Sequence, residues 1–283
     1  MATFSEIIDA LTARFAAAKI ESARADAELL VAEVLEVGRG ELLALALAGQ
    51  SPSSEQAEKI EAWAVRREAR EPLQHLSGRA YFRNLTLQVG PGVFVPRPET
   101  ELLAGLGIDA LRLYAEEAPI AIDLATGSGA VALALATEVP NSRVFAVELS
   151  EDAHRWASKN FAEVPNATLA LGDLRDAFLE LDGQVAVVVS NPPYIPDDMI
   201  PIYPEVVLHD PGLALYGGTD GLDLVRAVSV TARRLLRDGG FLAVEHADIQ
   251  SKAVCEILLA DGWRQVRPHQ DFNLRDRVVT AIK

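Results

Sequence analysis

The chain of 283 residues has 49% hydrophobic and 24% charged side chains, a balance that is typical of a folded protein and excludes global disorder. Its 41 acidic and 26 basic side chains give a formal net charge of −15, which disfavours long nucleic acid as a substrate because phosphates repel such a chain. No apolar run approaches the roughly 20 residues that cross a bilayer. The first residues lack the pattern of a secretory signal, and Cys255 is the only cysteine, so we expect a cytoplasmic protein without an intrachain disulfide.

Residues 1–78 have the pattern of a small helical bundle. Thr3 and Glu6 form a capping-box signature before a run of apolar residues at helical spacing. Ser22 opens a second periodic run that stops at Gly38, and Ser53 or Ser54 opens a third. We therefore expect an N-terminal helical domain.

Residues 79–98 have a different period and are interpreted as a connector. The segments YFRNLTLQV and VFV flank the sequence Gly-Pro-Gly, which predicts a β-hairpin that turns at these glycines. PRPET then breaks the strand and leads into a helix. Arg97, Glu99 and Glu101 are assigned to helix capping and salt bridges, with a share in shaping a substrate channel as the alternative.

Strand-like and helix-like segments alternate over residues 99–283. Apolar runs at 120–124, 143–149, 167–171, 185–190 and 241–246 are separated by helical stretches at 129–138, 151–162 and 220–237. This alternation predicts an α/β domain with a mostly parallel sheet covered on both faces. The last two strand-like runs lie too close together for a crossover helix, so an antiparallel pair is expected at one edge.

The sequence DLATGSGAVALALA is typical of a loop that binds a nucleoside cofactor. Gly127 and Gly129 fall where the first strand turns into a helix, and glycine there lets the backbone approach a ligand closely. Glu148 ends the next strand and can accept hydrogen bonds from both hydroxyls of a ribose. Because Gly127, Gly129 and Ala132 also satisfy a dinucleotide fingerprint, the loop alone leaves open an NAD enzyme, another nucleoside cofactor or a plain tight turn.

The sequence SNPPYIP at residues 190–196 follows the fourth parallel strand. Its prolines end the strand and hold the next residues extended, so a stiff turn is the simplest interpretation. The Asn191 side-chain oxygen and the Pro192 carbonyl are also spaced to accept both N–H bonds of a planar amide or amino group, which would direct its lone pair at an electrophilic methyl carbon. Tyr194 can stack on that group. The first and fourth strands end at one crevice, which favours this second interpretation.

These segments together resemble the bacterial peptide chain release factor glutamine methyltransferases. The resemblance is carried by the glycine loop, Glu148, GD at 172–173, NPPYIP and PRPETELL, and continues in PLQHLSG, LYGGTDGLD and DRVV over nearly the whole chain. NPPY alone is shared with methylases of DNA adenine and RNA guanine. A base amino group of nucleic acid is therefore the alternative acceptor.

The resemblance implies an S-adenosylmethionine-dependent methyltransferase domain at 99–283, with a seven-stranded Rossmann-like sheet, behind a helical domain that recognises the substrate. It implies a monomer that methylates the glutamine amide in the Gly-Gly-Gln loop of release factors, with S-adenosylhomocysteine as the product and no metal. By matching position, the cofactor would be bound by Ala125, Thr126, Gly127, Ser128, Gly129, Glu148, Asp173, Leu174 and Asn191. The amide would be held by Asn191, Pro192, Pro193 and Tyr194, of which Asn191, Pro192 and Tyr194 are the expected catalytic residues.

The chain departs from the family pattern at positions beside the expected cofactor. Ala125 and Ala247 stand where glycine is usual, Glu148 replaces aspartate, and Leu174 replaces an aromatic residue, so cofactor affinity is affected more than the reaction. Glu245 and His246 end the fifth parallel strand near the crevice and are candidates for support of its groups. The histidines have no metal-ligand spacing and no G-x-S-x-G motif is present, so neither a metal site nor a hydrolase is expected. A binding module without activity is disfavoured because Asn191 and the glycines are intact.

Overall fold

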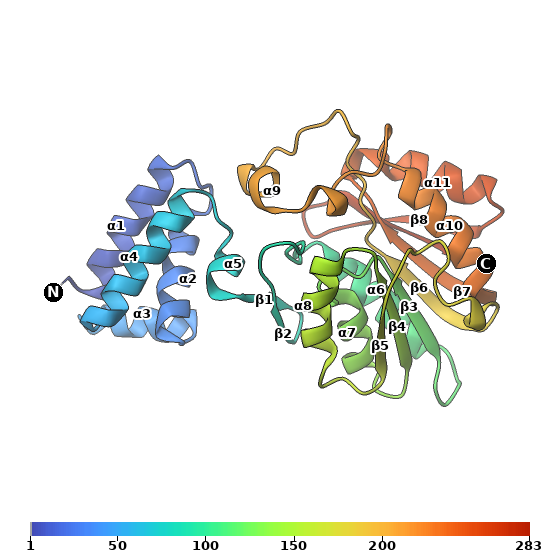
Figure 1. Ribbon diagram of the computed structural model, residues 1–283, viewed down its shortest axis with the longest axis horizontal. Coiled ribbons are helices and arrows are strands. Elements are labelled where there is room, and N and C mark those ends of the chain that lie inside the picture. The colour runs from blue at the N-terminus through green and yellow to red at the C-terminus, as the bar shows by residue number, and fades with distance from the viewer. Residues whose placement is uncertain (1) are drawn as a thin grey trace. The chain divides into compact units, whose positions relative to one another are not determined.

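The computed structural model describes residues 2–283, which divide into two units (Figure 1). One unit contains the described residues up to Arg79 together with Ile202–His209, and the other contains Ala80–Pro201 and Asp210–Lys283. Each unit has its own apolar core, and the second unit has one on each face of its sheet.

The first unit is a helical bundle, as the sequence predicts. Its helices are α1 (Phe4–Ala17), α2 (Ala23–Leu35), α3 (Arg39–Leu47), α4 (Ser54–Glu68), α5 (Leu73–Ser77) and α9 (Pro204–His209). The predicted capping box at Thr3 is confirmed: the Glu6 amide donates to Thr3 Oγ1 over 3.3 Å, and the Thr3 amide donates to Glu6 Oε2 over 2.8 Å. Ser53 caps α4 in the same way through Gln56.

Helix α9 belongs to the helical unit although the sequence groups it with the α/β domain at 99–283. Glu205 accepts a hydrogen bond from Arg67 Nη2 over 2.8 Å and lies 3.1 Å from Arg70 Nη1. Arg67 is only 5% exposed and also pairs with Asp26 over 2.7 Å. A buried guanidinium needs opposite charge around it, so Arg67 binds this distant segment to the bundle.

The predicted hairpin is present, but the prediction of its turn at Gly-Pro-Gly is wrong. β1 (Arg79–Phe82) and β2 (Leu85–Gln88) form a two-stranded sheet connected by Arg83 and Asn84. Gly90 instead lies against the Trp156 ring, where a Cβ would approach Cζ2 to 2.4 Å, and the Pro91 carbonyl accepts a hydrogen bond from Trp156 Nε1. The glycine therefore serves close packing on α8 (Glu151–Phe161) and not chain reversal.

The second unit contains the predicted seven-stranded sheet. Its strands are β3 (Ile120–Leu124), β4 (Arg143–Glu148), β5 (Ala167–Leu171), β6 (Val185–Ser190), β7 (Leu236–Glu245), β8 (Arg264–Gln270) and β9 (Asp276–Ile282). Their order is β5-β4-β3-β6-β7-β9-β8, with the pairs β7–β9 and β8–β9 antiparallel and all others parallel. The α/β fold class and the antiparallel edge are confirmed, and Pro268 lies in the edge strand β8, where a missing donor is tolerated.

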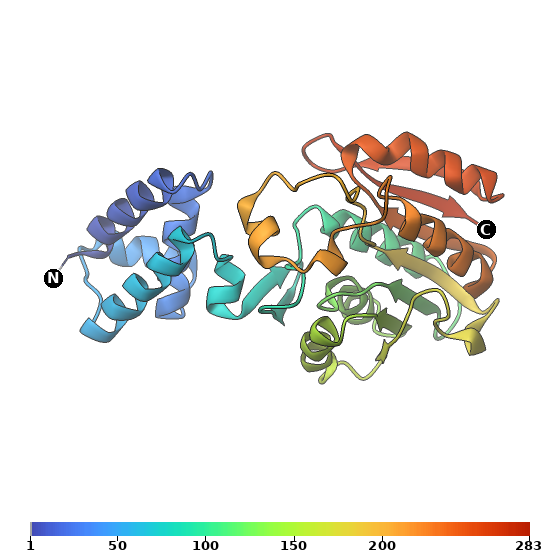
Figure 2. The same ribbon diagram turned by 45° about the horizontal axis from the view of Figure 1, so that its top comes forward.

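Helices cover both faces of this sheet, as Figures 1 and 2 show. α6 (Thr100–Arg112), α7 (Ala130–Glu138) and α8 pack on one face, and α10 (Asp223–Leu235) and α11 (Ser251–Ala260) pack on the other. Successive strand residues enter opposite cores, with Val187 on the α7 side and Val188 on the α10 side. The central strands β3 and β6 are buried on both faces, which explains why they read as continuous apolar runs.

The connections reverse the direction of the strand order between β3 and β6. From β3 the chain proceeds outward through β4 to β5, and it then returns to place β6 on the other side of β3. The strand order therefore changes direction between β3 and β6, and in open α/β sheets ligands bind beyond the carboxyl ends of the strands at such a point. The glycine loop follows β3 and the NPPY segment follows β6.

Candidate active site

The glycine loop is held by a buried carboxylate that the sequence analysis did not single out. Asp123 Oδ2 accepts hydrogen bonds from Thr126 Oγ1 over 2.6 Å and from the Ala132 amide over 3.1 Å. Burial raises the pKa of Asp123 to about 7; the two hydrogen bonds oppose this shift, and the nearby Glu148 adds to it. Asp123 thus joins the end of β3 to the first turn of α7.

Three residues of the loop have left-handed backbone: Ala125 at φ +64°, Gly127 at φ +60° and Gly129 at φ +90°. A Cβ on Gly129 would lie 2.5 Å from the Phe161 ring, so glycine is required there for packing. A Cβ on Gly127 would meet nothing within 4 Å, so this glycine faces open space. Ala125 has no such freedom, and its conformation costs on the order of 1 kcal/mol.

The side chains of the other two loop residues, Thr126 and Ser128, are not exposed to a ligand. Thr126 and Ser128 are buried, and the Thr126 hydroxyl is already engaged by Asp123. A cofactor in front of this loop would therefore meet its backbone, together with Ala125 and Gly127, and not these two hydroxyls.

Glu148 ends β4 with both carboxylate oxygens fixed by backbone donors. Oε2 accepts a hydrogen bond from the Gly127 amide and Oε1 accepts one from the Ser150 amide, each over 2.8 Å. Burial raises the pKa of Glu148, and these backbone donors oppose the shift. The Leu149 amide is a third backbone donor to this carboxylate. A carboxylate has about four lone-pair sites, so the group can still accept a hydrogen bond from a ribose while its orientation is held.

Asp173 and Leu174 lie just beyond the neighbouring strand β5. Asp173 is half-buried, and its carboxylate accepts hydrogen bonds from the Arg175 amide and from Arg175 Nη1, over 2.9 and 2.8 Å. Leu174 is packed in the apolar core on the α10 face. β5 pairs with β4 up to Glu148 and Leu171. Glu148, Asp173 and Leu174 therefore lie at the carboxyl ends of two neighbouring strands.

The NPPY segment begins beside the glycine loop. Ser190 ends β6 in register with Leu124, and its Oγ donates to the Leu124 carbonyl over 2.6 Å. Asn191 therefore lies across the strand pair from Ala125. Its Nδ2 donates to Thr100 Oγ1 over 3.3 Å, which leaves the amide oxygen free of that contact.

The remaining residues of the segment are fixed in place by burial. Pro192 and Pro193 are buried and Tyr194 is half-buried, and burial raises the pKa of the Tyr194 hydroxyl far above its ordinary value. The predicted amide-holding residues are thus consecutive at one strand end, beside the predicted cofactor loop.

The segment LYGGTDGLD supports the NPPY backbone, a role that the sequence analysis missed. A Cβ on Gly217 would lie 2.4 Å from the Pro193 carbonyl oxygen, and one on Gly221 would lie 2.3 Å from that of Tyr194. Gln250 Nε2 donates to the Tyr194 carbonyl over 2.8 Å. The cluster of glycines in this segment was the available signal, since adjacent glycines indicate close approach of two backbones.

Several other candidates have structural contacts that account for them. Arg97 pairs with Asp210 over 2.6 Å, and Glu101 Oε1 accepts a hydrogen bond from the Arg83 amide over 2.8 Å. Across residues 2–283, no group of three or more potential ligands is arranged to hold a metal ion. Over the same residues, no helix is long and apolar enough to span a membrane.

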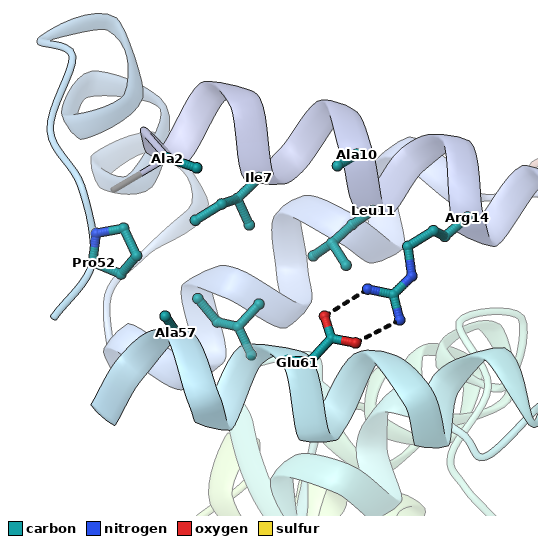
Figure 3. Close-up of a pocket in the computed structure, with 9 residues that line it drawn as sticks. Ala2, Ile7, Ala10, Leu11, Arg14, Pro52, Ala57 and Glu61 are labelled. Atoms are coloured by element: carbon teal, nitrogen blue, oxygen red, sulfur yellow. Dashed lines mark hydrogen bonds and ion pairs between the residues drawn. The ribbon is translucent and has the colours of Figure 1, made fainter. Parts of the chain in front are cut away.

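A separate hollow of about 250 Å³ lies in the helical unit, between α1 and α4 (Figure 3). Its walls are mostly aliphatic, and the ion pair between Arg14 and Glu61, 2.6 Å apart, lies at one end. Arg14 is also held by Glu68 over 2.7 Å, so both its charge and its donors are used within the bundle. The hollow has no group equipped for catalysis.

Comparison with known proteins assigns the chain to a family. Two sequence models of families match, one described as the PrmC N-terminal domain over residues 6–78 and one described as a methyltransferase domain over residues 121–206. The release factor glutamine methyltransferase of Streptomyces coelicolor is 53% identical over 274 residues, which are 96% of this chain and 95% of the relative. This chain belongs to the release factor glutamine methyltransferase family.

Two further likenesses define what the family and fold contain. A 4-amino-L-phenylalanine/4-methylamino-L-phenylalanine methyltransferase of Streptomyces pristinaespiralis is 40% identical over 99% of this chain and 95% of its own length. A solved methyltransferase of Pyrococcus furiosus has a TM-score of 0.51 at 18% identity, covers 82% of this chain and 99% of its own, and bears on the fold alone.

The family resemblance predicted from the sequence is therefore confirmed, and the cofactor of the family is S-adenosylmethionine. The NAD interpretation of the glycine loop is set aside. The residues at these strand ends fit the nucleoside cofactor: Gly127 faces open space, and backbone amides hold the Glu148 carboxylate while leaving it room to accept a further hydrogen bond.

Proposed function

We propose that this protein transfers a methyl group from S-adenosylmethionine to the side-chain amide nitrogen of the glutamine in the Gly-Gly-Gln motif of peptide chain release factors. The observation that carries the proposal is the hydrogen bond from Ser190 Oγ to the Leu124 carbonyl. It joins the ends of β6 and β3 at the point where the strand order changes direction, and so holds the NPPY segment beside the glycine loop.

The residues after β3, β4 and β5 would bind the cofactor. The backbone of Ala125–Gly129 would line its methionine part, Glu148 would accept hydrogen bonds from the ribose, and Asp173 and Leu174 would lie near the adenine. When bound, S-adenosylmethionine supplies an electrophilic methyl carbon on a sulfonium. Asn191, at the adjoining strand end, would contact both the cofactor and the acceptor.

The NPPY segment would orient the acceptor amide. An amide nitrogen is a poor nucleophile because its lone pair is delocalised into the carbonyl. Two oxygens, Asn191 Oδ1 and the Pro192 carbonyl, would accept its two N–H bonds and direct the lone pair out of the amide plane, while Pro193 keeps the rim rigid and Tyr194 stacks on the amide. Positioning of this kind can lower a bimolecular barrier by roughly 7–11 kcal/mol, far more than the roughly 0.5–1.5 kcal/mol of one hydrogen bond.

Two other planar nitrogen acceptors would suit the same two oxygens. One is the exocyclic amino group of a nucleic-acid base, which the net charge of −15 disfavours. The other is an aromatic amine such as the substrate named for the Streptomyces pristinaespiralis relative. The higher identity to a release factor enzyme, 53% against 40%, favours the release factor. We also propose that the enzyme acts in the cytoplasm as a monomer, and that its substrate is protein and not nucleic acid.

The test compares these acceptors directly. The enzyme is incubated with labelled S-adenosylmethionine and, separately, with release factor, release factor in which the Gly-Gly-Gln glutamine is alanine, total RNA and DNA, or 4-aminophenylalanine. We expect mass spectrometry to locate one added methylene on that glutamine and nothing on the alanine form. Label that enters only nucleic acid or only the aromatic amine would overturn the proposal.

We further propose that the helical domain, residues 1–78, recognises the release factor at a distance from the glutamine, a role inferred from its association with this catalytic fold. A short peptide that contains Gly-Gly-Gln lacks any distant surface. It should therefore have a much higher KM than intact release factor at a similar kcat. Equal kcat/KM values for the two substrates would contradict this role and leave the chemistry untouched.

A further inference from the structure

The two ends of the Asn191 amide are chemically different, and only one of them can serve the proposed reaction. An inference that rests on the proposed function follows from this difference. The oxygen must face the acceptor amide, because an NH₂ group in its place would repel the N–H bonds that it should accept. Some feature of the protein must therefore choose between the two orientations, which differ by a half-turn of the amide.

Two buried residues contact the side chain of Asn191. Thr100, the first residue of α6, is 4% exposed, and its Oγ1 accepts the hydrogen bond from Asn191 Nδ2 over 3.3 Å. The same hydroxyl donates to Glu245 Oε1 over 3.2 Å. Glu245 ends β7 and is 1% exposed, and β7 is in register with β6 at Ser190 and Val244, so Glu245 is the residue beside Asn191 on the next strand.

We propose that Thr100 and Glu245 are positioning residues that hold the Asn191 amide with its oxygen toward the acceptor. A hydroxyl has one proton to donate. Glu245 Oε1 accepts that proton from Thr100, which it can do when the carboxyl group is ionised and also when the group carries its own proton on Oε2. Thr100 then presents only lone pairs to Asn191, and only the NH₂ end of the amide can hydrogen bond to lone pairs. The order Asn191 to Thr100 to Glu245 therefore sets the direction of the amide.

The environment of Glu245 supports a functional reason for its presence. One of its oxygens, Oε2, is buried without a hydrogen-bond partner within residues 2–283. Burial raises the pKa of Glu245 to about 8, although hydrogen bonds with the Thr100 hydroxyl and with the Asn191 side chain, and the charge of Arg277, oppose the shift. A direct contact with this carboxyl group favours the NH₂ end of the Asn191 amide on the same side as Thr100 does. A carboxyl group in such a place destabilises the fold relative to an apolar side chain, and groups of this kind concentrate at functional sites.

The test is a double-mutant cycle on the full-length enzyme with release factor as substrate. Thr100→Val removes the hydroxyl at nearly constant shape and should lower kcat about five- to tenfold, the effect of losing one orienting hydrogen bond. Thr100→Ser keeps the hydroxyl and should restore kcat. If Thr100 acts through Asn191, then Thr100→Val should cost nothing further in an Asn191→Ala background.

Two controls separate positioning from stability. Thr231, on α10, is equally buried and its hydroxyl has only a 3.5 Å contact with the Arg175 carbonyl, so Thr231→Val should leave kcat unchanged. Glu245→Met replaces the carboxyl by an apolar chain of similar length. It should lower kcat while the unfolding midpoint stays level or rises, whereas a merely structural role predicts that both fall together.

The outcomes separate this inference from the function on which it rests. Thr100→Val with unchanged kcat, or with an effect that adds fully to that of Asn191→Ala, would overturn the positioning role alone. Asn191→Ala with unchanged kcat would instead overturn the role of Asn191 in holding the amide, and a wild-type enzyme that does not methylate release factor would overturn the proposed function. Loss of the Thr100→Val effect in the Asn191→Ala background, with rescue by serine, is the expected result.

Discussion

The Ser190 side chain donates a hydrogen bond of 2.6 Å to the carbonyl of Leu124, and both residues are completely buried. The two strands also pair through their ladder up to these residues. The bond lies at the last position before the chain leaves the sheet on either side, toward the glycine loop and toward NPPY. The Ser190 hydroxyl therefore lies next to both the glycine loop and the NPPY segment, whose separation must be constant for methyl transfer.

Replacing Ser190 by alanine should weaken cofactor binding as well as stability. The Leu124 carbonyl would lose its buried partner, at about 1–3 kcal/mol of unfolding free energy. Ser142→Ala is a matched control, because the Ser142 hydroxyl is also buried and also bonds a backbone carbonyl, that of Val139, over 2.7 Å. Calorimetry with S-adenosylhomocysteine should show weaker binding for Ser190→Ala only. Equal binding by both variants would show that the ladder alone positions the loop.

Asn191→Ala should separate binding from turnover. The variant lacks an acceptor for the glutamine amide, so turnover should fall at least ~10²-fold, since small errors of placement have effects of this size. The cofactor loop is unchanged, and affinity for S-adenosylhomocysteine should stay within a few fold. Turnover is measured by label transfer to release factor and affinity by calorimetry. A variant with full turnover would mean that the amide is held by other groups.

The strands of the catalytic unit could be predicted closely because periodicity and burial agree there. The run at 120–124 is β3 itself, and the run at 185–190 is β6, since strands buried on both faces need apolar residues at most positions. The two motifs at their ends could also be placed at one crevice. For these segments, local sequence and tertiary environment require the same residue types.

Contacts between distant residues could not be predicted in the same way. α3 was missed because its nine residues bury little more than Leu42 and have no regular apolar face. Gly90 and Gly217 resemble turn residues in sequence, but they are small because a ring and a carbonyl oxygen approach them. The sequence marks Glu245 as near the crevice, whereas its contact with Thr100 spans 145 positions in the chain and depends on how α6 packs on the sheet.

The stability of the catalytic unit should depend on pH through Asp123. Its pKa is about 7 in the fold against an ordinary value of 3.8, so between these values the folded state holds a proton that the unfolded chain has released. Stability from this group is therefore greatest at low pH and falls as pH rises through this window, by up to ~1.4 kcal/mol per pH unit, and levels off above pH 7.

Asp123→Asn removes the group that takes up this proton. The unfolding free energy of wild type minus that of the variant should therefore fall from pH 5 to pH 7 and then become constant. Urea unfolding at each pH measures it. Asp109→Asn is the control for the change of side chain, because Asp109 is exposed on α6. A pH-independent difference for Asp123→Asn would contradict the assignment.

Replacing Ala125 by glycine should stabilise the fold, and replacing it by valine should destabilise the fold. Its φ of +64° is unfavourable for any side chain and worst for a β-branched one. Ala125→Gly relieves this strain, partly offset by the greater flexibility of the unfolded chain, so we expect a gain of up to about 1 kcal/mol with equal or tighter cofactor binding. Ala125→Val should lose about 2 kcal/mol or more and bind the cofactor less tightly. Thermal unfolding ranks the three proteins by stability, and calorimetry ranks them by cofactor affinity. A valine variant more stable than the alanine protein would contradict the proposed strain.

Glu205→Ala should release residues 202–209 from the helical unit without unfolding that unit. Glu205 is the residue of α9 that forms ion pairs with Arg67 and Arg70. In the variant these pairs are lost, but Arg67 keeps its pair with Asp26. Hydrogen exchange followed by mass spectrometry should therefore speed up in 202–209 while the amides of α2 and α4 stay protected. Asp9→Ala serves as the control, because Asp9 pairs with the exposed Arg24 within the bundle, and surface pairs of this kind contribute little. Unchanged exchange at 202–209 in Glu205→Ala would mean that apolar contacts of α9, and not its charge, attach this segment to the bundle.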